Sequence, residues 1–328
     1  MRIVCTGGSG FIGTNVMDAL ITSGQTLLNL DFKSPRNRTQ EKYWQNIDIR
    51  NRESFTNALE QFQPEVVLHL AARTDLHGKS LADYSANVEG VQNLCDAVKN
   101  ITSVKRIIFI SSRLVCKIDY QPKTEDDYFP TTLYGESKVL GEKIVRGEMN
   151  CSDVDWIILR PTSIWGPWFG TPYKEFFLSI LHSHYVHPRN HSIQKSFGYV
   201  GNSVYLINEL IKDIPDALKK RTLYLCDYEP ISVLPWAKEI ASLANVRSPY
   251  EVPEFVMKAM AKSGDLLRFL GMKEPPITSF RLNNILTNMV YDTTPLQQHF
   301  PVLPYTASEG IKLTLDWIRS GSVPDEIS

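Results

Sequence analysis

The stretch that decides the fold is Thr6-Gly7-Gly8-Ser9-Gly10-Phe11-Ile12-Gly13, close to the start of the 328-residue sequence. It follows a short apolar run at residues 3–5 and opens an apolar helical pattern at residues 10–20. In such a strand–turn–helix unit, glycines allow a tight turn, close approach to a pyrophosphate and close helix–strand packing. The helix start adds free N–H groups. We therefore predict a dinucleotide-binding loop whose contact residues are Gly7, Gly10, Phe11, Ile12 and Gly13.

Apolar runs alternate with helical patterns through the first half of the sequence. Strands are expected at 3–5, 26–30, 65–70, 106–110 and 156–159, and helices at 10–20, 52–62, 87–99 and 134–148. Nearly continuous apolar strands suit a parallel sheet that is buried on both faces. The alternation predicts an α/β fold with a doubly wound parallel sheet of the Rossmann type.

The amino-acid composition changes after Pro161, where proline, aromatic residues and histidine become frequent. A further strand is expected at 222–226, and helices at 233–243 and 255–270. We predict an NAD-binding Rossmann domain over 1–163, rejoined by segments near 198–215 and 277–292. A smaller C-terminal α/β lobe, mainly for substrate binding, is expected over 164–328.

Composition excludes several classes of protein. A net charge of −1 argues against a nucleic-acid binder. Five scattered cysteines form no CxxC pair, and the histidines between 182 and 191 lack metal-ligand spacing, so we predict no metal site. Neither a signal peptide nor an apolar run long enough to span a bilayer is visible, which favours a cytoplasmic protein without a membrane partner.

Asp31 ends the second expected strand. A carboxylate at this place accepts hydrogen bonds from both ribose hydroxyls of a dinucleotide and repels a 2′-phosphate. The cofactor is therefore predicted to be NAD. The basic residues Lys33 and Arg36 nearby leave NADP open as an alternative.

Tyr134 and Lys138 are four residues apart, so on a helix they share one face. A tyrosine with an ordinary pKa near ~10 is a poor base, and a nearby ammonium favours its phenolate form. Ser112 follows the fourth expected strand, where a doubly wound sheet places ligands. We predict that Tyr134 removes the proton of a carbinol that Ser112 holds, while hydride leaves the same carbon.

As a set, these motifs resemble the extended short-chain dehydrogenase/reductase family, and within it the nucleotide-sugar epimerases and dehydratases. The resemblance covers nearly the whole sequence. It rests on the glycine motif, Asp48-Ile49, His69-Leu70-Ala71-Ala72, Asn87, Ser111-Ser112, Tyr134-Gly135-Glu136-Ser137-Lys138, Leu159-Arg160-Pro161 and Gly166-Pro167.

The resemblance implies further cofactor contacts. Asp48 and Ile49 would edge the adenine, Lys138 would reach the nicotinamide ribose, and Pro161 would flank the nicotinamide. The remaining residues expected along the cofactor are Leu70, Ala71, Ala72, Asn87, Ser111, Tyr134 and Ser163. The family usually forms homodimers through helices that would here include 87–99 and 134–148.

The substrate half departs from the family pattern. Dehydratases place an aspartate and a glutamate after the catalytic Ser or Thr, where this sequence has Arg113 and Leu114, so a 4,6-dehydratase is disfavoured. Cys116 is either a second acid/base group or, as we favour, a small packing residue. Candidate substrate contacts are Arg73, Arg113, Ser163, Arg268 and Arg281, since a guanidinium grips a diphosphate in two places.

The sequence thus predicts an NAD-dependent epimerase that acts on a nucleotide-activated sugar through a transient keto intermediate. A first alternative is a net reductase or dehydrogenase of a keto-sugar nucleotide or of a sterol-like alcohol. A second is a non-catalytic NAD-sensing protein, which the Ser112/Tyr134/Lys138 set disfavours.

Overall fold

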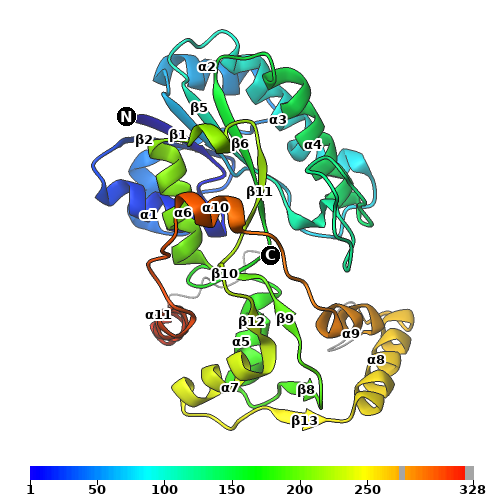
Figure 1. Ribbon diagram of the computed structural model, residues 1–328. Coiled ribbons are helices and arrows are strands. Elements are labelled where there is room, and N and C mark those ends of the chain that lie inside the picture. The colour runs from blue at the N-terminus through cyan, green and yellow to red at the C-terminus, as the bar shows by residue number, and fades with distance from the viewer. Residues whose placement is uncertain (273–277, 322–328) are drawn as a thin grey trace. The chain divides into compact units, whose positions relative to one another are not determined.

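The computed structural model describes residues 1–272 and 278–321, which form two compact units (Figure 1). Of the described residues, the first unit contains 1–169, 198–228 and 292–321; the second contains 170–197, 229–272 and 278–291. The segment 198–215 falls in the first unit, whereas 277–291 does not. In the second unit, Leu282 packs on Met257 and Ala261, which holds this segment there.

The centre of the first unit is a seven-stranded parallel sheet with the order β11-β6-β5-β4-β1-β2-β3. Chain order reverses at β1, because β2 and β3 extend to one side of it and β4, β5, β6 and β11 to the other. The strands are β1 (Arg2–Thr6), β2 (Thr26–Asp31), β3 (Trp44–Asn46), β4 (Val66–His69), β5 (Arg106–Ile110), β6 (Asp155–Pro161) and β11 (Thr222–Leu225).

Helices cover both faces of this sheet (Figure 1). The helices of the first unit are α1 (Phe11–Thr22), α2 (Arg52–Phe62), α3 (Ser85–Val98), α4 (Leu133–Met149), α6 (Val200–Lys212), α10 (Thr294–His299) and α11 (Ala307–Arg319). On one face, Phe55 of α2, Leu94 of α3 and Met149 of α4 form a continuous core with Val67 and Ile107 of the strands. The nearly uninterrupted apolar sequence of the strands follows from burial on both faces. The predicted doubly wound α/β fold is confirmed.

The second unit is smaller and has an aromatic core. Its elements are α5 (Tyr173–Leu181), β8 (Val186–Pro188), β9 (Gln194–Lys195), β12 (Ile231–Ser232), α7 (Val233–Ala244), β13 (Tyr250–Val252), α8 (Glu254–Phe269) and α9 (Ser279–Leu286). Phe176 stacks on Trp236 with ring centroids 5.1 Å apart, and Phe177 and Phe197 meet the same indole edge-on. The helices predicted at 233–243 and 255–270 correspond to α7 and α8.

Short elements complete the fold. β7 (Ser163–Trp165) pairs with β10 (Phe197–Tyr199), and 3-10 helices lie at Arg38–Tyr43, Leu81–Tyr84, Arg113–Val115 and Asp216–Leu218. Within residues 1–272 and 278–321, no helix is long and apolar enough to cross a membrane.

Candidate functional site

The glycine loop lies where the strand order of the sheet reverses, after β1 and beside the end of β4. In a doubly wound sheet, ligands bind at this switch point. Gly7 has φ +73, and a Cβ on it would be 2.5 Å from the backbone nitrogen of Ala71. Only glycine combines this positive φ with so close an approach. The loop is fixed by two backbone bonds, from Gly7 N to Leu30 O (3.0 Å) and from Leu70 N to Thr6 O (2.9 Å).

The amino end of α1 is open for an anion. Gly10 is its N-cap, in extended conformation and without a side-chain cap. The first N–H groups of the helix, from Phe11 onward, therefore need an external acceptor. A Cβ on Gly13 would lie 2.4 Å from Gly7 O, so helix and loop touch directly. This cradle of backbone atoms fits the pyrophosphate of a dinucleotide, as the glycine spacing predicts.

Asp31 ends β2 beside this loop and is 8% exposed. Its carboxylate accepts hydrogen bonds from Ser9 N (3.1 Å) and Lys33 N (3.0 Å). Burial raises the pKa of Asp31, and these two bonds oppose the rise. Each carboxylate oxygen keeps a second lone pair. The carboxyl group is thus fixed by the loop and still able to accept from ribose hydroxyls.

Other predicted cofactor residues lie near the same strand ends. Ile49 is buried against α3, where a Cβ on Gly90 would lie 2.3 Å from it, while Asp48 pairs with Arg50 at 2.5 Å. Asn87 is fully buried and joins two segments, accepting from Arg73 N (2.8 Å) and donating to Ser137 Oγ (2.9 Å). Asn87 therefore links the loop after β4 to α4, the helix that carries Tyr134.

The first turn of α4 holds Tyr134 against Ser112. Thr132 caps the helix by accepting from Gly135 N (3.0 Å). A Cβ on Gly135 would lie 2.1 Å from Leu114 O, so only glycine lets the helix begin directly on the segment after β5. The structure brings the side chain of Tyr134 close to that of Ser112, and both residues are less than 9% exposed. The predicted Ser/Tyr pair is therefore assembled in the structure.

Lys138 lies one turn further along α4, and its Nζ donates to Ile110 O at 2.9 Å. Burial lowers its pKa to about 8, and the nearby Glu142 opposes this shift. Burial raises the pKa of Tyr134 to about 12, although the nearby Ser112 hydroxyl opposes this rise. Desolvation dominates this pKa and the ammonium donates to a backbone carbonyl, so the expectation that Lys138 makes the phenol more acidic stays a prediction.

Glu142 is the residue of the site that sequence reasoning missed. It is 3% exposed and lies one further turn along the same face of α4. Its carboxylate accepts from Ser111 Oγ at 2.5 Å and from Arg160 at 2.9 and 2.7 Å. Tyr128 Oη also donates to it at 3.1 Å. The i, i+4, i+8 spacing of Tyr134, Lys138 and Glu142 was the available signal.

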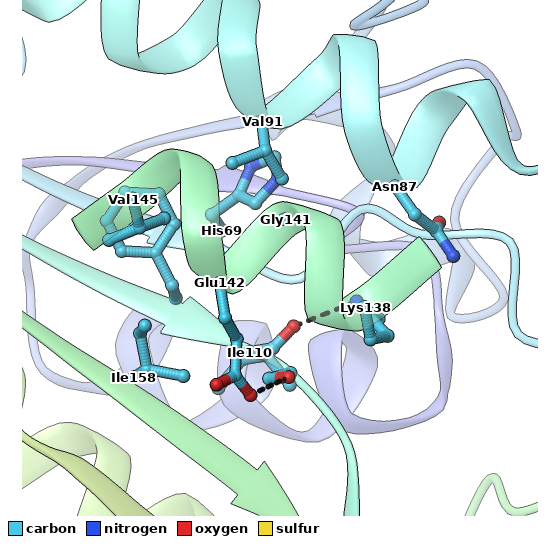
Figure 2. Close-up of a pocket in the computed structure, with 11 residues that line it drawn as sticks. His69, Asn87, Val91, Ile110, Lys138, Gly141, Glu142, Val145 and Ile158 are labelled. Carbon is cyan, nitrogen blue, oxygen red and sulfur yellow. Dashed lines mark hydrogen bonds between the residues drawn. The ribbon is translucent and has the colours of Figure 1, made fainter. Parts of the chain in front are cut away.

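A small cavity of ≈ 20 Å³ lies behind Lys138, between α4 and the ends of β4 and β5 (Figure 2). Its polar lining includes Lys138, Glu142, Ser111 and His69. His69 is 3% exposed, and its Nδ1 is 2.8 Å from Thr6 Oγ1, whereas the described residues offer its Nε2 no partner. The volume suits one water molecule. Burial lowers the pKa of His69 to about 3, and the charge of Lys138 adds to this effect.

The arginines proposed for the substrate differ in their surroundings. Arg73 is engaged with Asp75, Nε to Oδ2 at 2.7 Å, and with Asp83 O at 3.0 Å. Arg113 is 8% exposed, and no described residue accepts from its Nη1. Arg268 is exposed in the last turn of α8. Arg281 belongs to α9, and its side chain lies outside the described residues.

The remaining predicted positions lie near the end of β6. Pro161 ends that strand half-buried, and Ser163 begins β7 and is 4% exposed. Cys116 is buried in an apolar cluster with Val115 and Val139, and burial raises its pKa. This environment keeps the thiol protonated and fits the packing role that the sequence favours.

No group of three or more potential metal ligands lies together in the described part of the chain. Two of the histidines at 182–191 have other partners. His187 Nδ1 is 3.0 Å from Tyr185 Oη, and His191 Nε2 is 3.0 Å from Glu254.

Comparison with known proteins agrees with this geometry. The family model for the NAD dependent epimerase/dehydratase family matches residues 3–195, more than half of the sequence. The chain belongs to this family.

Two curated relatives and one solved structure show the range of activities among proteins similar to this chain. N-acetyl-alpha-D-glucosaminyl-diphospho-ditrans,octacis-undecaprenol 4-epimerase of Escherichia coli O157:H7 is 25% identical, with 100% of this chain and 98% of the relative covered. 3-Beta-hydroxysteroid dehydrogenase of Mycolicibacterium neoaurum is 26% identical, with 94% and 88% covered. UDP-glucose 4-epimerase of Thermus thermophilus, solved with NAD, has a TM-score of 0.72 at 20% identity, with 97% and 99% covered. The structural likeness confirms the fold of this family member.

Proposed function

We propose that the protein is an NAD-dependent 4-epimerase of a nucleotide-activated sugar. One observation carries the proposal: the Ser112/Tyr134 pair and Lys138 lie at the ends of the same sheet as an open glycine loop and a buried Asp31. The names of the relatives support it, since two of the three reported above are 4-epimerases and one was solved with NAD. NAD, when bound, supplies the hydride acceptor and later the donor.

The residues of the chain divide the proton chemistry between them. Ser112 holds the hydroxyl of the sugar carbon that reacts, and Tyr134 Oη takes its proton. The resulting ketone returns to an alcohol when Tyr134 gives the proton back, after the keto sugar has presented its other face. Both steps use the same acid/base group, as microscopic reversibility allows. Lys138 fixes the end of β5 through its bond to Ile110 O, and from one turn along α4 it would supply a positive charge on the helix face that carries the phenol.

A dehydrogenase of a sterol-like alcohol is the second candidate. The steroid dehydrogenase relative is as similar as the epimerase relative and covers nearly as much of the chain. The same Ser/Tyr/Lys chemistry serves both reactions. They differ in whether the ketone is reduced in place or released with net formation of NADH.

Ligand binding and product analysis separate the two. A thermal-shift panel would compare NAD, NADP and the UDP-, GDP-, dTDP- and CDP-sugars, alone and with NAD, because a ligand of the native state raises stability. The stabilising sugar nucleotide would then be incubated with enzyme and NAD, and its 4-epimer sought by NMR. Epimer formation without accumulating NADH is expected. Net NADH with a sterol, and no stabilisation by any sugar nucleotide, would instead favour the dehydrogenase.

We further infer a homodimer through α3 and α4, located in the cytoplasm and serving polysaccharide biosynthesis. The dimer rests on the usual interface of the family. Light scattering after size exclusion should give a mass near twice 37.3 kDa. A monomer at micromolar concentration would contradict this part of the proposal.

A further inference from the structure

Helix α8 of the second unit has two apolar faces, and only one of them is covered. Met257, Ala261 and Gly264 are buried at i, i+4 and i+7, where Met257 and Ala261 pack on Leu282 and its neighbours. This contact fixes the helix on the unit. The opposite face is exposed.

Exposed apolar side chains are concentrated along α8 and the residues that follow it. The described residues of the whole chain include sixteen exposed large apolar side chains, and seven of these fall within residues 255–272. The largest exposed fractions are those of Phe269 (87%), Phe255 (73%), Leu270 (70%) and Leu266 (58%). They are joined by Met260, Leu267 and Met272. We call these seven residues the α8 stripe. Isolated exposed apolar residues need no explanation, but a cluster of this kind marks an interaction surface.

The stripe is bordered by basic side chains. Lys258 and Lys262 lie one turn apart on α8 and are exposed. Lys258 also pairs with Glu254 at 2.6 Å. Over its whole length, the second unit has ten basic and seven acidic side chains, a net charge of +3, although the chain as a whole is at −1. The stripe thus belongs to the positively charged unit of the molecule.

We propose that the α8 stripe docks the protein on an anionic lipid surface. A helix with phenylalanine and leucine on one face and lysine beside it lies in the plane of a bilayer interface without spanning it. The lysines then meet the anionic headgroups. A second copy of the chain fits less well, because a twofold contact through this face would bring two +3 units together. A helix that lies in the plane of the interface does not need to span the membrane, so the absence of a spanning helix among the described residues does not contradict this proposal. The proposed docking does depart from the sequence-based expectation of no membrane partner.

Docking of this kind stands apart from the proposed reaction, because it needs neither NAD nor a sugar. It would bring the enzyme to the surface where lipid-borne molecules are found. The test is therefore made without substrate.

The test is co-sedimentation of the full-length protein with phosphatidylcholine vesicles that contain or lack phosphatidylglycerol. We expect binding to the anionic vesicles that weakens with added salt. The variant Phe255→Ser/Leu266→Ser/Leu270→Ser should lower the partition coefficient roughly tenfold or more. The matched control Leu76→Ser/Val302→Ser/Leu313→Ser removes three exposed apolar side chains elsewhere and should bind like the parent. Lys258→Gln/Lys262→Gln should lower binding to anionic vesicles by roughly fivefold per lysine.

Thermal unfolding of each variant shows that it is folded. Failure of the parent protein to bind either kind of vesicle would overturn the proposal. So would equal loss in the α8 variant and in the matched control. Sedimentation equilibrium tests whether a second copy of the chain binds the α8 stripe instead. If the parent protein self-associates, the α8 variant does not, and neither binds vesicles, the stripe is a contact between two copies and the lipid proposal is wrong.

Discussion

Arg160 and Glu142 form a two-pronged ion pair in the interior, with Nε–Oε1 at 2.9 Å and Nη2–Oε2 at 2.7 Å and both side chains 2% exposed. The same carboxylate accepts from Ser111 and lies one helical turn from Lys138. The pair therefore connects the end of β6 with the residues that surround the catalytic set.

Arg160→Met should destabilise the protein by about 3–5 kcal/mol, because it leaves the Glu142 carboxylate buried without its cation. The double variant Arg160→Met/Glu142→Gln removes both charges and should recover much of that loss. Urea unfolding of the two variants and the parent measures the difference. A double variant as unstable as Arg160→Met would show that packing, and not charge pairing, is the function of these residues.

Tyr134→Phe should lower kcat by roughly 10²–10⁴-fold, the usual contribution of a general acid/base group. The ring is buried and packs at 6.2 Å from Tyr84, a contact that phenylalanine keeps. NAD affinity and thermal stability should therefore change little, and both serve as controls. Turnover within tenfold of the parent would remove Tyr134 from the mechanism.

Asp31→Ala should weaken NAD binding and improve NADP binding relative to it. The carboxylate is the predicted partner of the ribose hydroxyls, and its loss removes the repulsion of a 2′-phosphate. Arg36, whose Nη1 donates to Trp168 O at 2.7 Å, supplies a cation nearby. Calorimetric titration with both cofactors gives the ratio of affinities. An unchanged ratio would mean that Asp31 does not face the ribose.

The stability of the cofactor-free protein should fall in acid, partly because of His69. Its pKa is lowered from 6.5 to about 3 in the folded state, so between these values the unfolded chain binds a proton that the folded chain does not. The free energy of unfolding therefore decreases as the pH falls from 6.5 toward 3, by a few kcal/mol from this group. His69→Asn should flatten that dependence in thermal unfolding at pH 7.5 and pH 5. An equal dependence of stability on pH in the parent and in His69→Asn would show that His69 does not cause the loss of stability in acid.

Gly13→Ala should abolish NAD binding and lower stability, since its Cβ would lie 2.4 Å from Gly7 O and 2.7 Å from Gly8 Cα. Gly147→Ala is the matched control, because nothing lies within 4 Å of its Cβ on α4. That control should stabilise the helix by about 0.5–1 kcal/mol. Fluorescence titration with NAD and thermal unfolding report both effects. Retained NAD affinity in Gly13→Ala would argue against the phosphate loop.

The sequence by itself determined the sheet of the first unit, and it supplied the members of the proposed catalytic set. Long apolar strands, the glycine loop and the four-residue spacing of Tyr134 and Lys138 are local patterns, so they can be read without knowing the fold. Even so, the short strand β3 and the helices α5, α6, α9, α10 and α11 were not predicted.

Only the tertiary structure decided the state of the site. The pKa of Tyr134 depends on burial, and the Lys138 ammonium donates to Ile110 O; neither follows from spacing along a helix. Glu142 gains its role from Arg160 of β6 and from Ser111, which follows β5; both are distant from Glu142 along the chain. The return of the chain at Asp292, and not near 277, depends on the packing of α9 on α8. The α8 stripe shows the same limit: sequence places the apolar residues on a helix, but only packing reveals which of its two apolar faces stays uncovered.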